Sequence, residues 1–330
     1  MERRRWIALA VAIVLVFVSL GARLVFFVAS DNFSKIFSFE MNDLYVDETI
    51  IRNGSITEKI AVIHLDGAII DAGSTGFLVE GYDHDAMLAM IERAFADKMV
   101  DGIVLKVDSP GGGVYETAQI YRKIVEGKEE YDKPFYVSMG SMAASGGYYV
   151  SAPADKIFAE SSTITGSIGV IMQNTNFSGL AERYGVTFNT IKSGKHKDIM
   201  SSTREMTDEE REILQSIIDE MYDEFVRVIA EGRSMDEADV RRIGDGRIYT
   251  GLQAKEINLV DEIGNLDDAI DQMMEDHGLK DATVVEYNYT PGFFSSFGLQ
   301  VKGLFDDMSE LKMIQQLLVE SDQPRAYYMY

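Results

Sequence analysis

Ser138-Met-Gly-Ser-Met-Ala-Ala-Ser-Gly-Gly-Tyr-Tyr-Val-Ser151 is the stretch around which the rest of the chain is organised. It holds four serines, three glycines and two alanines, and it continues the apolar, strand-like run 135–138. Residues this small let the backbone approach another segment closely. We interpret the stretch as a strand that leads into a helix, with Ser145 at the junction. Ser145 is the candidate nucleophile, and such a serine needs a base to take its proton.

Strands and helices alternate on both sides of this stretch. Short apolar runs that end in polar or glycine-rich turns predict buried strands at 59–66, 102–107, 135–138 and 156–160. Apolar residues at helical spacing predict helices over 83–98 and 114–131, and a long acidic helix starts after Thr207, a candidate cap with Glu210 three residues on. Strands that alternate with helices favour parallel pairing, so the expected fold class is α/β with βαβ units.

Composition narrows the chemistry that the chain can carry. The 330 residues include no cysteine, which excludes disulfides, thiolate metal sites and a cysteine nucleophile. The net charge is −23, and a surface this acidic repels nucleic acid and anionic lipid headgroups. We therefore expect no nucleic-acid partner.

The N-terminal end resembles a membrane anchor. Residues 1–5 are basic, residues 6–22 carry no charge, and the apolar run resumes after Arg23 as far as Ala29. About 20 apolar residues cross a bilayer, and the basic end stays in the cytoplasm. The alternative is a cleaved signal peptide, for which 28–30 is a weak cleavage site.

Four regions follow from these patterns. We predict a basic end and transmembrane helix at 1–30, a linker at 31–58, a folded domain at 59–288 and a C-terminal extension at 289–330. The last residues, Ala326-Tyr-Tyr-Met-Tyr330, form an apolar tail. One hypothesis is that this tail enters an active site as an inhibitor or as a substrate of the enzyme itself.

Two glycine-rich turns follow strands, Asp108-Ser-Pro-Gly-Gly-Gly113 and Ala144-Ser-Gly-Gly147. Neither turn fits a dinucleotide or phosphate-binding motif, and we expect no cofactor and no metal. Two backbone N–H groups aimed at one point form an oxyanion hole, and the candidates are the amides of Gly146 and Gly112. The alternative is that both are tight turns between packed elements.

The base for Ser145 is either a histidine or a lysine. Among the histidines, only His196 lies in a small, polar, loop-like setting, near Asp198. In an extended segment these two side chains share one side and Lys197 points to the other. A lysine base must be neutral, so its pKa must fall from about 10.4 to roughly 7–8. The sequence by itself does not choose among Lys192, Lys195 and Lys197.

Five motifs in order resemble those of the signal peptide peptidase A family, which are membrane-anchored serine–lysine proteases. The motifs are Asp108–Gly113, Met139–Tyr149, Ile164–Gly169, Ser193–Asp198 and Gly246–Ala254. The resemblance covers about residues 59–275 in the short, single-unit form, and it implies a domain with the Clp protease/crotonase-like fold.

The resemblance also implies roles for single residues. Ser145 is then the nucleophile, Lys197 the general base, and Ser167 the hydroxyl that orients the lysine, with Gly112 and Gly146 at the oxyanion positions. It implies a homo-oligomer with its active site outside the cytoplasmic membrane, and peptide substrates such as cleaved signal peptides.

Two other functions remain open. One is a crotonase-type acyl-CoA enzyme, since that fold also holds an oxyanion with paired backbone amides; the anchor and the lack of a basic patch for the CoA phosphates count against it. The other is a non-catalytic membrane scaffold in which the serine motif is only a close contact between a helix and a strand.

Overall fold

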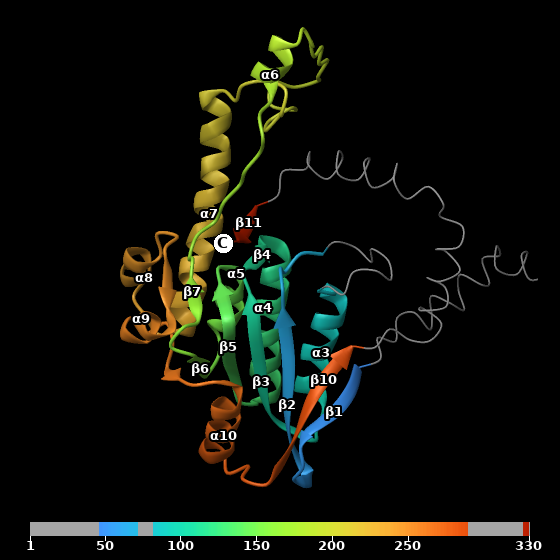
Figure 1. Ribbon diagram of the computed structural model, residues 1–330, viewed down its shortest axis with the longest axis vertical. Coiled ribbons are helices and arrows are strands. Elements are labelled where there is room, and N and C mark those ends of the chain that lie inside the picture. Colours follow the sequence, from blue (N-terminus) through green and yellow to red (C-terminus); the bar gives the residue numbers. More distant parts are fainter. Residues whose placement is uncertain (1–45, 72–81, 290–325, 330) are drawn as a thin grey trace, which may run out of the picture.

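The computed structural model describes residues 46–71, 82–289 and 326–329 (Figure 1). The strands are β1 (Val46–Arg52), β2 (Ser55–Asp66), β3 (Val100–Ser109), β4 (Gly111–Gly113), β5 (Phe135–Ala144), β6 (Lys156–Ala159), β7 (Ile164–Gly166), β8 (Ile248–Thr250), β9 (Glu262–Ile263), β10 (Ala282–Tyr289) and β11 (Tyr327–Met329). The helices are α3 (His84–Ala96), α4 (Val114–Tyr131), α5 (Gly146–Ser151), α6 (Ser178–Arg183), α7 (Asp208–Gly232), α8 (Glu237–Ile243), α9 (Gly251–Glu256) and α10 (Leu266–Asp276).

The main sheet is mostly parallel. Its strands follow the order β1-β10-β2-β3-β5-β6-β9, and every pair along it is parallel except β1 with β10. Beyond the end of β6, β7 pairs in parallel with the last part of β5 and antiparallel with β8. The predicted α/β class is confirmed, and the carboxyl end of β5 reaches the edge of the sheet where parallel folds place their sites.

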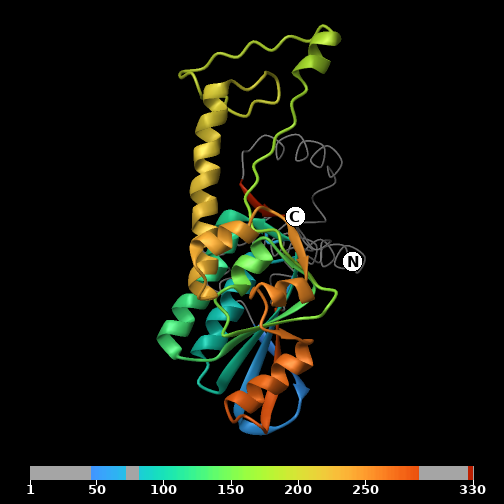
Figure 2. The ribbon, with the colours of Figure 1, turned by 90° about the vertical axis from the view of Figure 1, so that its left-hand side faces the viewer.

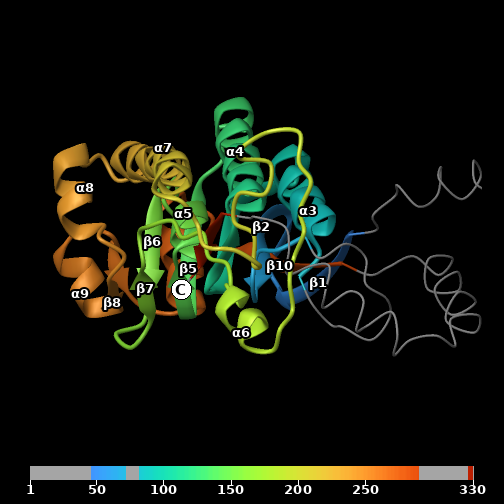
Figure 3. The same cartoon turned by 90° about the horizontal axis from the view of Figure 1, so that it is seen from above.

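Strand β2 shows how the sequence builds two hydrophobic layers. Ala61, Ile63 and Leu65 belong to the larger buried cluster, with side chains of α3, α4 and α7. Ile60 and Val62 point to the opposite face and pack in a second cluster with α10. Successive side chains of a strand point to opposite faces, so an unbroken apolar run is needed when both faces are covered. Figure 3 shows α3, α4 and α7 along one face of the sheet.

Helix α7 extends from the body of the protein as one side of an arm (Figure 2). Its C-terminal half is buried in the larger cluster through Phe225, Val226, Val228 and Ile229. Its N-terminal half rises away from the sheet together with α6 and the segment 184–207 that joins the two helices. Thr207 caps the helix as predicted, in a reciprocal pair of hydrogen bonds with Glu210.

The predicted boundary of the linker is corrected at its C-terminal end. Residues 46–52, assigned to the linker, form β1 at the edge of the sheet, and β2 begins at Ser55. An edge strand with one open face needs no continuous apolar run, and Ile50 and Ile51 of β1 are exposed, so the pattern of a buried strand is missing. The anchor predicted at 1–30 lies outside the described residues. Within the ranges described, no helix is both long and apolar enough to cross a bilayer.

Candidate active site

Ser145 occupies the junction between β5 and α5, where the sequence predicts a nucleophile. Its backbone has a φ of 55° and a ψ of −116°, a strained conformation for a residue with a side chain. The residue is 1% exposed, and its hydroxyl has no hydrogen-bond partner among the residues that the structure describes. A sharp turn between a strand and a helix presents a serine hydroxyl at the end of a sheet in other hydrolases. The geometry therefore leaves this hydroxyl available for chemistry.

The two glycine-rich turns meet directly at Ser145. A Cβ placed on Gly146 would lie 3.2 Å from the amide nitrogen of Gly112 and 3.1 Å from the Cα of Gly111. A Cβ placed on Gly111 would lie 2.7 Å from the amide nitrogen of Gly146. Only residues without side chains allow this approach, and Gly111 also has a φ of +98°. The turns thus bring the amides of Gly112 and Gly146 into one small region beside the candidate nucleophile.

Asp108 joins the first glycine-rich turn to strand β5, shortly before the second turn. Its carboxylate accepts hydrogen bonds from the hydroxyl of Ser141 at 2.8 Å and from the amide of Met142 at 3.1 Å. Within the first turn, the hydroxyl of Ser109 accepts a bond from the amide of Gly111. The sequence motif contains these residues, but nothing in it assigns Asp108 this role. The hydroxyl of Ser141 therefore has a structural role.

Ser167 lies close to Ser145. The amide of Ser145 donates to the carbonyl of Gly166 at 2.8 Å, and the amide of Ser167 donates to the carbonyl of Arg247. Ser167 also has a positive φ, 51°, and is 7% exposed. The structure therefore brings Ser145, Ser167, Gly112 and Gly146 together.

The C-terminal tail lies against the first glycine turn. Strand β11 pairs antiparallel with β4, with Tyr328 opposite Gly112 and Met329 opposite Gly111. On its other side, Tyr327 exchanges two backbone hydrogen bonds of 3.0 Å with Ile171. A Cβ on Gly111 would lie 2.0 Å from the carbonyl oxygen of Tyr328, so this peptide carbonyl lies beside the turn. An extended chain can thus bind here as an added strand.

The side chain of Tyr328 fills an aromatic pocket behind the tail. Its ring packs against Tyr149, with centroids 5.1 Å apart, and against Phe225, at 4.7 Å. Its hydroxyl donates to the carbonyl of Met221 at 3.1 Å. Burial raises the pKa of Tyr328 well above its ordinary value, so the phenol stays neutral. The sequence does not indicate this pocket, because Tyr149 and Phe225 have the pattern of ordinary core residues.

Residues 192–198, called the lysine loop below, carry the three lysines that the sequence leaves equivalent. Their contacts in the structure differ. Lys192 pairs with Asp198, and Lys195 pairs with Glu209. The side chain of Lys197 makes no ion pair or hydrogen bond with any residue in the described part of the chain, and it is exposed. His196, the alternative base, lies between Glu209 and Glu210, its Nε2 3.3 Å from Glu209.

Within one chain, this loop lies far from Ser145. His196 contacts Glu209 at the start of α7, whereas Tyr149, on the helix that follows Ser145, packs against Phe225. A helix rises about 1.5 Å per residue, so roughly 22 Å of helix separate Glu210 from Phe225. Figure 1 shows the segment that carries the loop near the tip of the arm. The alternative in which His196, near Asp198, serves as the base for Ser145 is therefore not assembled within one copy, and neither is the pair of Ser145 and Lys197.

The comparisons with known proteins show the family of this chain. The family model described as peptidase family S49 matches residues 128–280. An Enterococcus faecium protein with the name of a signal peptide peptidase SppA is 40% identical over 342 residues, which cover 100% of this chain and 99% of that protein. The chain belongs to the SppA family of S49 peptidases.

Other S49 relatives match only in part. Protease 4 of Haemophilus influenzae is 33% identical over 66% of this chain and 35% of its own length. The chloroplastic serine protease SPPA of Arabidopsis thaliana is 29% identical over 78% of this chain and 40% of its own length. Family membership makes this protein a serine protease, and it confirms the resemblance found in the sequence.

A cavity of about 550 Å³ opens beside Ser167 of this S49 peptidase. It lies between the segment 167–171, the middle of α7 (residues 215–222) and the loop before β8, and Met329 of the tail lines it. Asp219, Tyr222 and Asp245 are among its polar wall residues. The cavity therefore adjoins Ser167, whose hydroxyl, according to the family resemblance, orients the lysine base.

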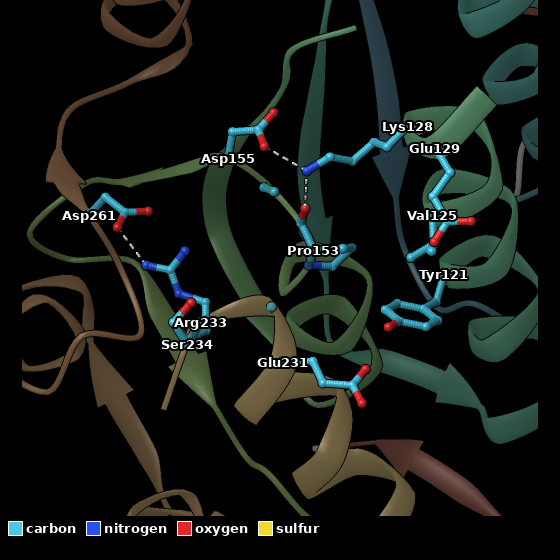
Figure 4. Close-up of a pocket in the computed structure, with 12 residues that line it drawn as sticks. Tyr121, Val125, Lys128, Glu129, Pro153, Asp155, Glu231, Arg233, Ser234 and Asp261 are labelled. Carbon is cyan, nitrogen blue, oxygen red and sulfur yellow. Dashed lines mark hydrogen bonds and ion pairs between the residues drawn. The ribbon is translucent and has the colours of Figure 1, made fainter. Parts of the chain in front are cut away.

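Another cavity, of about 590 Å³, lies between α4 and the C-terminal end of α7 (Figure 4). Its charged groups bind one another: Lys128 donates to Asp155 and to the carbonyl of Pro153, and Arg233 donates to Asp261. Neither Ser145 nor the glycines of β4 are among its lining residues. We interpret these pairs as structural links between helices and the sheet.

Proposed function

We propose that this serine protease is an endopeptidase in which Ser145 is the nucleophile and Lys197 of a neighbouring copy is the general base. The observation that carries the proposal is the unpartnered hydroxyl of Ser145 on a strained turn, next to the amides of Gly112 and Gly146. The tail strand supports a peptide substrate, because it lies at that turn as an added strand.

The reaction proceeds in two halves. The neutral amine of Lys197 takes the proton of Ser145, whose oxygen bonds to the peptide carbonyl carbon, and the amides of Gly112 and Gly146 stabilise the oxyanion. Lys197 then gives the proton to the departing amine as the C–N bond breaks. In the second half Lys197 takes a proton from water, the hydroxide attacks the acyl group, and the bond to Ser145 breaks as its hydroxyl re-forms. Ser167 positions the lysine amine.

A neighbouring copy is needed because of the distance between the lysine loop and Ser145 in one chain. The start of α7 holds the lysine loop roughly 20 Å from Ser145, so one chain cannot close the pair. The cavity beside Ser167 offers room for a lysine that arrives from outside. The arm between Ile171 and Ile217 also exposes many large apolar side chains, among them Leu180, Tyr184 and Ile191. Exposed apolar patches on this scale mark protein contacts, which supports a homo-oligomer.

The finer assignments belong to the same proposal. We infer the Clp protease/crotonase-like fold from the parallel sheet with paired glycine turns. We also propose that residues 6–29 cross the membrane once and that the catalytic domain lies outside the cytoplasmic membrane. The substrates are cleaved signal peptides and other unfolded, membrane-associated peptides. An extended strand-binding site fits such chains, since an unfolded chain has free backbone groups that can pair with β4.

Covalent labelling separates this function from an acyl-CoA enzyme or a scaffold. A serine-reactive phosphonate is expected to modify the assembled protein once per chain, at Ser145, with no binding of CoA. The Lys197→Ala variant should label at least about 10-fold more slowly, because the base contributes about 10²–10⁴-fold. Peptide mapping by mass spectrometry checks the site. Saturable CoA binding without labelling would favour the acyl-CoA enzyme.

The tail should compete with substrate. A chain that ends at residue 325 is expected to show a several-fold lower KM for an unfolded peptide with kcat unchanged, because β11 no longer pairs with β4. The synthetic peptide Ala-Tyr-Tyr-Met-Tyr should then inhibit the truncated enzyme competitively. Intact masses of the wild type and of Ser145→Ala show whether the enzyme also trims its own C-terminus. An unchanged KM after truncation would show that the tail does not block the site.

A further inference from the structure

Asp198 poses a problem for a lysine base at the next position. A carboxylate within about 4–6 Å of an ammonium group favours the charged form and shifts its pKa by about 1–3 units. A lysine that pairs with Asp198 would stay protonated at neutral pH and could not accept the proton of Ser145. The carboxylate of Asp198 must therefore be engaged elsewhere.

Arg204 binds this carboxylate on both oxygens. Its Nε donates to Oδ2 of Asp198 at 2.9 Å and its Nη2 to Oδ1 at 2.7 Å, and Nη2 also donates to the backbone carbonyl of Asp198 at 3.0 Å. Lys192 donates to Oδ1 as well. These bonds, from Arg204 first and then from Lys192, hold the pKa of Asp198 far below its usual range. Both oxygens of this carboxylate therefore accept hydrogen bonds from residues other than Lys197.

The other side of Arg204 is fixed to α7. Its Nη1 donates to Oε2 of Glu210 at 2.8 Å, and Glu210 is 2% exposed. Glu210 also accepts the amide of Thr207 in the capping box, and Arg204 lowers its pKa to about 2, so it remains ionised. The loop is thus attached through one guanidinium to the rigid first turn of a long helix.

We propose that Arg204 is a positioning residue for Lys197: it binds Asp198 and Glu210 together, which keeps the Asp198 carboxylate from the lysine amine and fixes the loop that presents this amine. The inference rests on the proposed function, since it assumes that Lys197 is the base. A lysine at 204 could not replace this fork, because an ammonium group cannot donate in parallel to both oxygens of one carboxylate while it reaches a second.

Several other charged groups surround the loop and bear on its pH dependence. They come from the loop itself, from the segment before α7 and from the first turn of α7: Lys192, Lys195, His196, Glu205, Glu209 and Glu210. Glu209 is engaged by Lys195 and His196 and Glu210 by Arg204. Removal of Arg204 therefore leaves Asp198 with Lys192 alone and also frees Glu210. Of these two carboxylates, Asp198 is the one that directly follows Lys197 in the chain.

The test is the pH profile of kcat for Arg204→Gln in the assembled, full-length enzyme. The acidic limb of this profile, where the base loses its proton, should shift to higher pH by about one pH unit or more. The value of kcat should then be about tenfold lower than wild type at pH 7 and close to wild type near pH 10. KM should stay within about twofold. Arg204→Gln combined with Asp198→Asn should return the limb to its wild-type position, which a merely structural role would not predict.

The controls separate the possible failures. Arg211→Gln removes a charge from the same arm, at an exposed site on α7, and should leave the limb unmoved. If Arg204→Gln does not assemble, Arg204→Lys should give a smaller shift of the same sign. A wild-type limb in an Arg204 variant, while Lys197→Ala is inactive, overturns this inference alone. Activity retained in Lys197→Ala overturns the proposed function itself.

Discussion

Ser145→Ala and Lys197→Ala, prepared separately, are each expected to lose at least about 1,000-fold in kcat/KM, and a mixed assembly of the two should regain activity. Removal of one member of a nucleophile–base unit costs about as much as removal of both. The mixture should differ because the lysine loop and Ser145 lie toward opposite ends of α7, and in the proposed mechanism they meet between copies. In a random one-to-one assembly, about a quarter of neighbouring pairs combine the intact serine with the intact lysine.

The measurement is peptide hydrolysis after the two variants are unfolded, mixed and refolded together. Lys195→Ala is the matched control, because Lys195 pairs with Glu209 and should not act as a base. A mixture as inactive as its components would contradict a site shared between copies. Wild-type activity in Lys197→Ala together with its loss in His196→Ala would overturn the lysine assignment in favour of histidine.

Gly111→Ala should reduce kcat/KM by at least about 100-fold, comparable to the loss of one oxyanion donor. The new Cβ would lie 2.7 Å from the amide nitrogen of Gly146 and 2.0 Å from the position of a bound strand's carbonyl oxygen, and both neighbours are backbone atoms. The methyl group would therefore displace either the amide or the substrate.

Backbone strain at Gly111 needs its own control. Gly67→Ala places alanine at a similarly positive φ, +80°, with no atom within 4 Å of the new Cβ. It should cost stability but leave kcat unchanged. Thermal unfolding followed by circular dichroism compares the strain in the two variants, and hydrolysis compares their activity. Equal activity in Gly111→Ala and wild type would argue against an oxyanion site at this turn.

The part of the fold that was predicted correctly depends on local patterns. The apolar runs of β2, β3 and β5, the turn at Ser145 and the cap of α7 each depend on residues near one another in the chain. Strand β1 escaped prediction because it lies at an edge and pairs with β10, more than 200 residues later. The pairing of β11 with β4 is equally distant in sequence, and no periodicity in three residues could indicate it.

The site residues also divide into those that sequence patterns predict and those that the patterns leave open. The residues Ser145, Gly112, Gly146 and Ser167 were predicted to act together, and the structure brings them together because parallel strands end at a common edge. The lysine was a matter of family resemblance, since spacing alone left three candidates. Lys195 pairs with Glu209 and Lys192 with Asp198, contacts that only a three-dimensional structure shows. The role of Lys197 as the base stays a prediction.

The hydrogen bonds of the Asp108 carboxylate affect how the segments around the site open locally. It joins the turn after β3 to the end of β5, so the segments that carry Gly112 and Gly146 belong to one cooperative unit rather than to two independent loops. Local opening of such a unit would expose both amides at once and at a free energy set by the central strands. We therefore expect the two glycine-rich segments to open together with the central strands rather than as separate loops.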